Sequence, residues 1–174
     1  RRHHVRVAVP TGKTPAGGHP WPYLHDGNAA LLATDAALLE RLSKAPRPPV
    51  IAYIGYDNDL RIDADSRAFD YTPRRPGGDD AQQDAIGGRR NGGADAFLDL
   101  VQAAIAPRVE ALVPVDPSRR ALWGHSYGGV FALHALFSRP QAFAIFAAAD
   151  PSLWWGNGQL LREAGVVEVL GLYL

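Results

Sequence analysis

Apolar runs and helical periodicities alternate along the first third of the chain. Residues 3–9 alternate apolar and polar side chains and end at a proline, which is typical of an antiparallel edge strand. A short strand is predicted over 20–26, although His25 stands where an apolar residue would suit a buried strand. Leucines at helical spacing predict a helix over 29–42, which the following prolines close.

The middle of the chain changes character twice. Residues 50–56 form an unbroken apolar run, which indicates a strand covered on both faces. Residues 57–93 are rich in Asp, Arg, Gly and Pro and hold too little apolar material for a core of their own, so we expect either the wall of an active site or a mobile loop. A helix interrupted at Pro107 is predicted over 94–112.

The last third repeats the alternation. Residues 116–118 predict a turn into a short apolar strand at 121–123, and a helical pattern follows from Phe131. A buried strand is predicted over 143–149, an aromatic loop over 150–156, a short helix over 158–164 and a strand over 166–174. Strands that alternate with helices predict an α/β fold with a mostly parallel central sheet flanked by helices.

One stretch carries the candidate chemistry. Gly124-His125-Ser126-Tyr127-Gly128 has the form G-x-S-x-G between a strand and a helix, which is the form of a nucleophile elbow. The glycines leave room around a tight turn in which Ser126 is exposed, and the helix that follows directs free N–H groups at the group that Ser126 attacks. The alternative is a chance match in a chain with 18 glycines, but the flanking elements favour a nucleophile.

A nucleophilic serine needs an oxyanion hole and a general base. The backbone amide of Tyr127 is the first expected donor and that of Asn28, in Asp26-Gly27-Asn28, is the second. The alternative for Asn28 is ordinary turn chemistry, with its side chain as a helix N-cap.

The general base is not found in the sequence. The only histidine after Ser126 is His134, which lies about two helical turns, ~12 Å, farther along and is expected to be a satisfied helix histidine. His125 points away from Ser126 and is expected to be buried support. The four earlier histidines precede the elbow and are not assigned a role.

Three further residues are candidates for the site. Asp150 follows a strand, where a triad acid can lie, although Asp150-Pro151-Ser152 is also a natural turn. Arg67 is either a guanidinium that faces an anionic or catecholate substrate, or a surface arginine paired with Asp65 or Asp70. Trp154 and Trp155 are core or interfacial aromatics, and the polar loop beside them favours a pocket wall.

Composition limits the class of protein. The 174 residues are 47% hydrophobic and 21% charged, with 18 basic and 18 acidic side chains, so no net charge favours nucleic acid or a membrane surface. No apolar run is long enough to span a bilayer, and no cysteine, metal-ligand spacing or phosphate-binding loop points to a cofactor. The chain contains no methionine, which indicates a trimmed chain or omitted residues.

The chain resembles the esterase D–type α/β hydrolases, and within them the ferric-siderophore esterases of the enterobactin and salmochelin branch. The resemblance covers roughly residues 5–164 and rests on five segments: Asp26-Gly27-Asn28, residues 66–73, Gly92-Gly93-Ala94, residues 123–129 and residues 151–155. The block Ser-Arg-Ala-Phe-Asp-Tyr-Thr-Pro at 66–73 is the specific part, since the elbow alone indicates only a serine hydrolase.

The resemblance implies hydrolysis of ester bonds in a trilactone catecholate siderophore, with release of its iron, in the bacterial periplasm or cytoplasm. It makes Ser126 the nucleophile, the Asn28 and Tyr127 amides the oxyanion hole, and Arg67 a substrate contact. The family carries its catalytic histidine near the C-terminus, where this chain has none. We therefore expect one α/β-hydrolase domain over 1–174 that lacks its C-terminal catalytic segment.

Three functions remain open. The first is a siderophore esterase, the second a general carboxylesterase of the same superfamily, and the third a catalytically inactive siderophore-binding protein. The substrate-binding residues expected for the first are Arg67 and Trp154.

Overall fold

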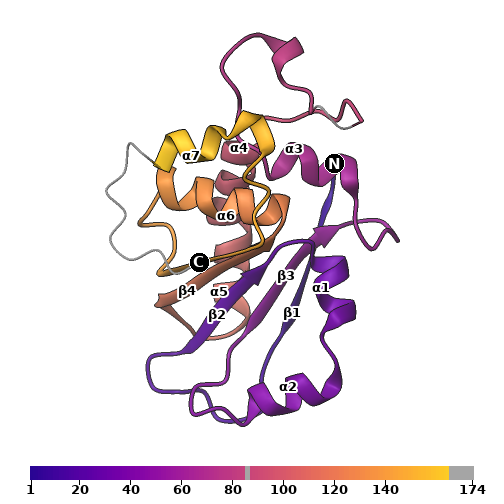
Figure 1. Ribbon diagram of the computed structural model, residues 1–174. Helices are drawn as coiled ribbons and strands as arrows, with labels where there is room; N and C mark the ends of the chain where they lie inside the picture. Colours follow the sequence, from indigo (N-terminus) through magenta and orange to yellow (C-terminus); the bar gives the residue numbers. More distant parts are fainter. Residues whose placement is uncertain (85–86, 165–174) are drawn as a thin grey trace.

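Five strands form one mixed sheet in the order β1-β3-β2-β4-β5 (Figure 1). The computed structural model describes residues 1–84 and 87–164. The strands are β1 (His3–Ala8), β2 (His19–Leu24), β3 (Ile51–Tyr56), β4 (Val115–His125) and β5 (Ile145–Ala149). β1 pairs antiparallel with β3 at one edge, and the remaining neighbours pair in parallel. The predicted antiparallel edge strand and mostly parallel sheet are therefore confirmed.

Helices cover both faces of this sheet. They are α1 (Gly27–Ala33), α2 (Ala36–Ser43), α3 (Ala64–Asp70), α4 (Ala94–Leu100), α5 (Ala106–Leu112), α6 (Tyr127–Ser138) and α7 (Gln159–Ala164), with short 3₁₀ turns η1 (Asp79–Ala81) and η3 (Trp155–Asn157). Figure 1 shows α1 and α2 on one side of the sheet and α4, α5 and α6 on the other. None of the helices in the described residues is long and apolar enough to cross a bilayer.

The helix predicted over 29–42 is two helices, so that prediction is wrong. α1 ends at Thr34, whose backbone is extended, and Asp35 begins α2 as an N-cap that accepts a hydrogen bond from the Leu38 amide at 2.7 Å. Thr34 also donates its hydroxyl to the Ala30 carbonyl. Side chains of this kind compete for backbone groups, and here they divide a continuous apolar periodicity.

Two further helix predictions need correction. Residues 57–93 contain α3, whose N-cap Asp63 accepts from the Ser66 amide at 2.9 Å, a start signal that the polar composition concealed. The helix over 94–112 is not interrupted at Pro107, because this proline lies in the first turn of α5, where its missing N–H is not needed. The irregularity lies upstream, in a π-helical turn η2 (Val101–Ile105).

Of the strand predictions, that of β3 is confirmed and those around β4 and β5 need correction. Every residue of β3 is buried, as expected. β4 begins at Val115, but its register with β2 shifts between the pairs His19/Val115 and Trp21/Arg120, and the Ser118 amide donates to the Asp116 carboxylate at 3.0 Å, so the turn predicted at 116–118 is present as an irregularity within β4. The prediction of a buried strand over 143–149 is wrong for β5, because none of its residues is buried and Ile145, at the edge of the sheet formed by the described residues, is 56% exposed. The helix predicted over 158–164 is confirmed as α7, and the strand predicted over 166–174 lies outside the described residues.

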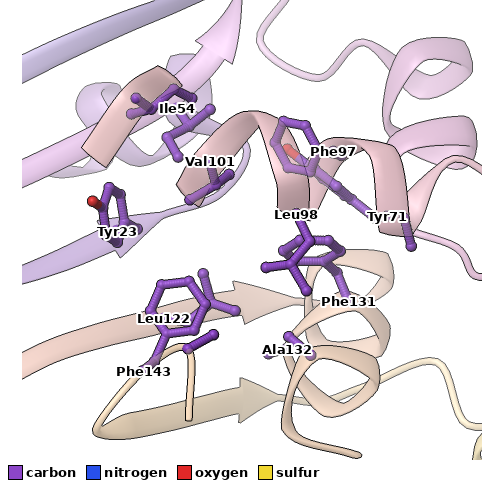
Figure 2. Packing of buried hydrophobic residues seen from close by; sticks show 14 of the residues in the cluster. Tyr23, Ile54, Tyr71, Phe97, Leu98, Val101, Leu122, Phe131, Ala132 and Phe143 are labelled. Carbon is purple, nitrogen blue, oxygen red and sulfur yellow. The ribbon is translucent and has the colours of Figure 1, made fainter. Parts of the chain in front are cut away.

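The main core lies between the sheet and helices α4 and α6 (Figure 2). Strand residues Tyr23, Ile54 and Leu122 meet Phe97 of α4 and Phe131 of α6, and all five are at most 3% exposed. The Phe97 and Phe131 ring centroids lie 5.2 Å apart. This packing fixes α6, and with it the end of β4 from which α6 starts.

His25 belongs to the same core. Its ring centroid lies 4.8 Å from that of Phe131 and 5.1 Å from that of Tyr71, it is fully buried, and neither ring nitrogen has a hydrogen-bond partner among the residues that the structure describes. Burial, and then the positive charge of Arg67, lowers the pKa of His25 to about 3. The histidine therefore acts as a neutral aromatic core residue.

His134 is in the opposite situation. It lies on α6, with Nε2 3.1 Å from a carboxylate oxygen of Asp95 on α4 and Nδ1 3.6 Å from one of Glu163 on α7. Burial acts to lower the pKa of His134, but the interactions with Glu163 and Asp95 outweigh it and raise the pKa above its ordinary value. His134 is thus a helix histidine held between two carboxylates, as the sequence predicts in outline, although among the described residues only Nε2 makes a hydrogen bond.

The junction of β4 and α6 depends on two glycines. A Cβ atom on Gly124 would lie 2.1 Å from the Gly128 carbonyl oxygen, so the strand backbone touches the first turn of α6 directly. Gly129 extends this close approach, because a Cβ there would lie 3.0 Å from Pro151 in the loop after β5.

We predict that Gly124→Ala destabilises the protein by about 3 kcal/mol or more, because a rigid backbone contact cannot make room for a methyl group. The denaturant midpoint measures this. Gly12→Ala is the matched control, since nothing lies within 4 Å of its added Cβ. Equal midpoints for the two variants would contradict the packing described for the junction.

We predict that His25→Leu reduces the acid sensitivity of folding. Because the folded pKa of His25 lies near 3 and the unfolded value near 6.5, the unfolded chain binds the extra proton in this window. Stability from this group is therefore lost as pH falls below 6.5, by about tenfold in the folding equilibrium per pH unit. Urea midpoints from pH 7 to 4 should fall less steeply in the variant.

His134→Gln serves as the comparison, with the opposite sign. The raised pKa of His134 means that its contribution is complete below pH 6.5 and is lost as pH rises through the folded pKa. The variant should lose up to about 1 kcal/mol at pH 5.5 and less at pH 8.5. Parallel pH profiles for the two histidine variants would contradict both assignments.

Candidate active site

Three loops meet at the carboxyl edge of the parallel strands. Register pairs Leu24 of β2 with Trp123 of β4, and His125 of β4 with Ala149 of β5. The segments that leave these strands, 26–28, 126–128 and 150–155, are therefore neighbours. This is the edge at which open α/β sheets place their ligand sites.

Ser126 lies between β4 and α6 in a strained conformation. Its φ of 57° and ψ of −115° are rarely adopted by a residue with a side chain, at a cost of about 1–3 kcal/mol. Its amide donates to the Ala149 carbonyl at 3.1 Å, and its own carbonyl accepts from Val130 at 3.0 Å and from Ser152 at 3.3 Å. These bonds hold the backbone in the predicted nucleophile elbow.

The Ser126 hydroxyl is partly exposed and lies 3.0 Å from the hydroxyl of Ser152. In the part of the chain that the structure describes, no histidine is hydrogen-bonded to Ser126. Ser152 was missed by the sequence analysis, where it appeared only as a turn residue. Asp150, the candidate acid, is exposed and has a φ of 41°.

The candidate oxyanion donors belong to the first turns of two helices. Tyr127 begins α6 and Asn28 is the second residue of α1, and the first amides of a helix have no acceptor within it. The N-cap of α1 is Asp26, so the alternative of Asn28 as N-cap is wrong. The Asn28 side chain donates instead to the carbonyls of Tyr56, Asn58 and Leu60 at 2.9–3.2 Å.

Two glycines, Gly27 and Gly55, allow the 26–28 segment to lie directly against β3. A Cβ on Gly27 would lie 2.5 Å from the Ile54 backbone, and one on Gly55 would lie 2.1 Å from the Asn28 side chain. Asp26 adopts a left-handed conformation, with φ 51° and ψ 47°, that turns the chain from β2 into α1. This contact fixes the height of the first amides of α1 above the sheet.

Arg67 on α3 binds Asp26 with both arms of its guanidinium. Nε donates to one carboxylate oxygen at 2.9 Å and Nη2 to the other at 2.8 Å, while Nη2 also lies 3.2 Å from the His125 carbonyl. The side chains of the pair are only 12% and 11% exposed. The alternative of a surface arginine paired with Asp65 or Asp70 is wrong, since Asp65 pairs with Arg89 and Asp70 with Arg1 and His3.

Tyrosines enclose this ion pair. The guanidinium lies 5.6 Å from the ring centroid of Tyr71 and 5.4 Å from that of Tyr127, and the Tyr71 hydroxyl accepts from the Asp26 amide at 3.0 Å. Burial acts to lower the pKa of Arg67, but the hydrogen bonds and charge of Asp26 outweigh it and raise the pKa. Burial, and then the charge of Asp84, raises the pKa of Tyr127. The tyrosines are thus neutral and the arginine is charged.

The two tryptophans of the 150–155 loop separate. Trp155 is 2% exposed and belongs to the core, whereas Trp154 is 56% exposed, with its ring centroid 6.0 Å from that of Tyr127. Trp154 therefore offers an exposed aromatic surface beside the elbow, and its role as a pocket wall stays a prediction.

His125 is exposed, so the prediction of a buried support residue is wrong. Its side chain lies on the same face of the sheet as that of Trp123, two residues earlier, and this face carries α1. A cleft of about 320 Å³ lies there, between α1 and the end of β4, and His125 lines it together with Trp123 and Asp26. Within residues 1–84 and 87–164, no three His, Cys, Asp or Glu side chains cluster in a way that could hold a metal ion.

Comparison with known proteins agrees with this geometry. The family model described as "Putative esterase" matches residues 1–167. The chain is 41% identical to the apo-salmochelin esterase of Escherichia coli O6:H1, over 98% of this chain and 53% of that protein. It is 40% identical to the siderophore triacetylfusarinine C esterase of Aspergillus fumigatus, over 87% of this chain and 50% of that protein.

A solved structure supports the same relationship. The enterobactin hydrolase IroE in complex with DFP is similar with a TM-score of 0.83 and 40% identity, over 97% of this chain and 65% of that one. The chain spans about half the length of the curated relatives it matches. Given a family match over nearly all of its length and relatives above 30% identity, this chain belongs to the Esterase family of α/β hydrolases, with relatives among the siderophore esterases of the IroE type.

Proposed function

We propose that the protein is a serine esterase that hydrolyses ester bonds of a catecholate siderophore through an acyl-enzyme. The observation that carries the proposal is Ser126, a strained and partly exposed serine between β4 and α6. The curated relatives named above are esterases of salmochelin and of triacetylfusarinine C, which supports a siderophore ester as the substrate.

The chemistry follows from the elbow. Ser126 Oγ attacks the ester carbonyl while its proton passes to a general base, and the C–O bond of the ester then breaks as the departing alcohol takes that proton. The amides of Tyr127 and Asn28 receive the oxyanion, at helix N-termini where the dipole adds to their effect. Water then releases the acyl group from Ser126.

The general base of this proposal is a histidine outside the contacts described for Ser126. His134 cannot serve, because Asp95 and Glu163 hold it on α6.

Opening of a trilactone separates the chelating arms of the siderophore, which lowers its affinity for iron because the arms are no longer held together. Iron is cargo of the substrate in this scheme and not a cofactor of the protein.

Arg67 and Trp154 are the proposed substrate contacts. Asp26 occupies Nε and Nη2 of Arg67, and Nη1 has no acceptor among the residues described. Arg67 thus has one edge for an anionic catecholate oxygen, and the exposed face of Trp154 can stack on the catechol ring. The same guanidinium fixes Asp26 beside the proposed oxyanion donors.

Ser126→Ala should lower kcat for an enterobactin-type ester and for a nitrophenyl ester by about 10⁴-fold or more, because no nucleophile remains. Ser43→Ala is the matched control, since within the described part of the chain that hydroxyl bonds only to a carbonyl of its own helix α2. If the unaltered protein binds the siderophore but turns over neither ester, it is a binding protein. If it turns over only the nitrophenyl ester, it is a general carboxylesterase.

Arg67→Lys should have two separable effects. Loss of the two-armed contact with Asp26 should lower kcat/KM for both esters by about tenfold. Loss of the remaining guanidinium edge should raise KM for the catecholate ester alone by a further factor of about ten. The measurement is kcat and KM for both substrates.

Arg108→Lys is the control for Arg67, because among residues 1–84 and 87–164 the Arg108 guanidinium donates only to the Ala104 carbonyl of the preceding turn. Equal losses for the two esters in Arg67→Lys would show that Arg67 positions the 26–28 segment and does not contact the substrate. Unchanged kinetics for both esters would contradict both roles.

A further inference from the structure

The hydroxyl that lies against Ser126 comes from the loop after β5. Ser152 Oγ is 3.0 Å from Ser126 Oγ, and Ser152 is 7% exposed. No role in the reaction proposed above uses this group. A buried hydroxyl at hydrogen-bond distance from a nucleophile affects both the direction of the nucleophile's proton and the rotamer of its side chain.

Backbone contacts fix Ser152 from both sides. Its amide donates to the Ser126 carbonyl at 3.3 Å, and its carbonyl accepts from the Trp155 amide at 2.9 Å. The preceding Pro151 packs on Gly129, where a Cβ would lie at 3.0 Å. The loop is thus attached to the first turn of α6, and the Ser152 hydroxyl is held in place before any substrate arrives.

When two hydroxyls face each other, one donates its proton to the hydrogen bond and the other accepts it, and the direction of this bond matters for the reaction. If Ser126 donated to Ser152, its proton would point away from the general base and attack would be delayed. If Ser152 donates to Ser126, the Ser126 proton is free for the base and a lone pair of Oγ remains for the carbonyl. Ser152 keeps its own proton throughout, so no net transfer to or from it is needed.

The donor is useful in both halves of the reaction. In acylation it holds Ser126 Oγ in one rotamer while the bond to the acyl carbon forms. In deacylation the same Oγ leaves as the acyl bond breaks, and a hydrogen bond from Ser152 stabilises the charge on the departing oxygen.

We propose that Ser152 is a positioning residue of the nucleophile, which donates its hydroxyl proton to Ser126 Oγ and holds that atom in the attacking rotamer. The proposal rests on the proposed function, because it assigns a partner to the same serine. It concerns the rate of the chemical steps and not the affinity for the substrate.

The test compares Ser152→Ala and Ser152→Thr with the intact protein on a nitrophenyl ester. One hydrogen bond of this kind changes a rate by about tenfold. We expect Ser152→Ala to lower kcat by about tenfold with KM unchanged within twofold, and Ser152→Thr to restore most of kcat because it keeps the hydroxyl. Diisopropyl fluorophosphate modifies the nucleophilic serine and depends little on the substrate pocket. In the alanine variant the rate of this modification should fall by about the same factor as kcat.

Ser138→Ala is the matched control, since the Ser138 hydroxyl donates to the His134 carbonyl of α6, and it should leave kcat unchanged. Thermal midpoints check that each variant is folded. Wild-type kcat in Ser152→Ala would overturn the proposal, and so would equal losses in the alanine and threonine variants, which would mean that loop packing matters and the hydroxyl does not. An intact protein that neither turns over the ester nor is labelled at Ser126 would refute the proposed function instead.

Discussion

The site depends on the backbone of Ser126, which must be held where a residue with a side chain rarely lies. About 1–3 kcal/mol of strain at φ 57° persists only if the surroundings leave no other conformation. The buried face of α6, with Phe131 in the aromatic core, fixes the helix, and the contact of Gly124 with Gly128 fixes the strand against it. The chain between these two fixed elements is too short to relax.

A second constraint joins the loops around the elbow. Arg67 reaches from α3 to the Asp26 carboxylate after β2 and to the carbonyl of His125, the last residue of β4, so one guanidinium links three segments that are far apart in sequence. Taking two charges out of water is expensive, and the paired geometry with two parallel hydrogen bonds compensates for it. Such a pair contributes little net stability, but it specifies where the first turn of α1 lies relative to Ser126.

How much the sequence could predict depends on the range of the interaction. Local patterns gave the sheet strands, the edge position of β1 and the elbow, because alternation, glycine placement and helix signals act over a few residues. The division of 29–42 was readable in principle from Thr34 and Asp35, but the leucine periodicity hid it. The assignment of residues 57–93 to a loop missed α3 because a short helix can depend on its cap rather than on an apolar face.

The long-range contacts could not be read from the chain. Arg67 has acidic neighbours two and three residues away, yet its partner is 41 residues distant, since α3 packs against α4 and α6 and its Arg67 side chain reaches Asp26. His125 is exposed rather than buried because its face of the sheet borders the cleft beside α1. The partner of Arg67 and the exposure of His125 are thus decided by which elements pack together and not by the local sequence pattern.

The contact of Ser126 with Ser152 shows why the strand order matters most for the chemistry. These residues are 26 positions apart, and they meet because β4 and β5 are parallel neighbours whose ends are in register, His125 beside Ala149. Any residue three positions beyond the end of β5 is therefore brought near the elbow, and whether it acts on Ser126 depends on its side chain. A parallel sheet thus fixes the positions at which a nucleophile can find partners, while the loops that leave its strands decide which groups occupy them.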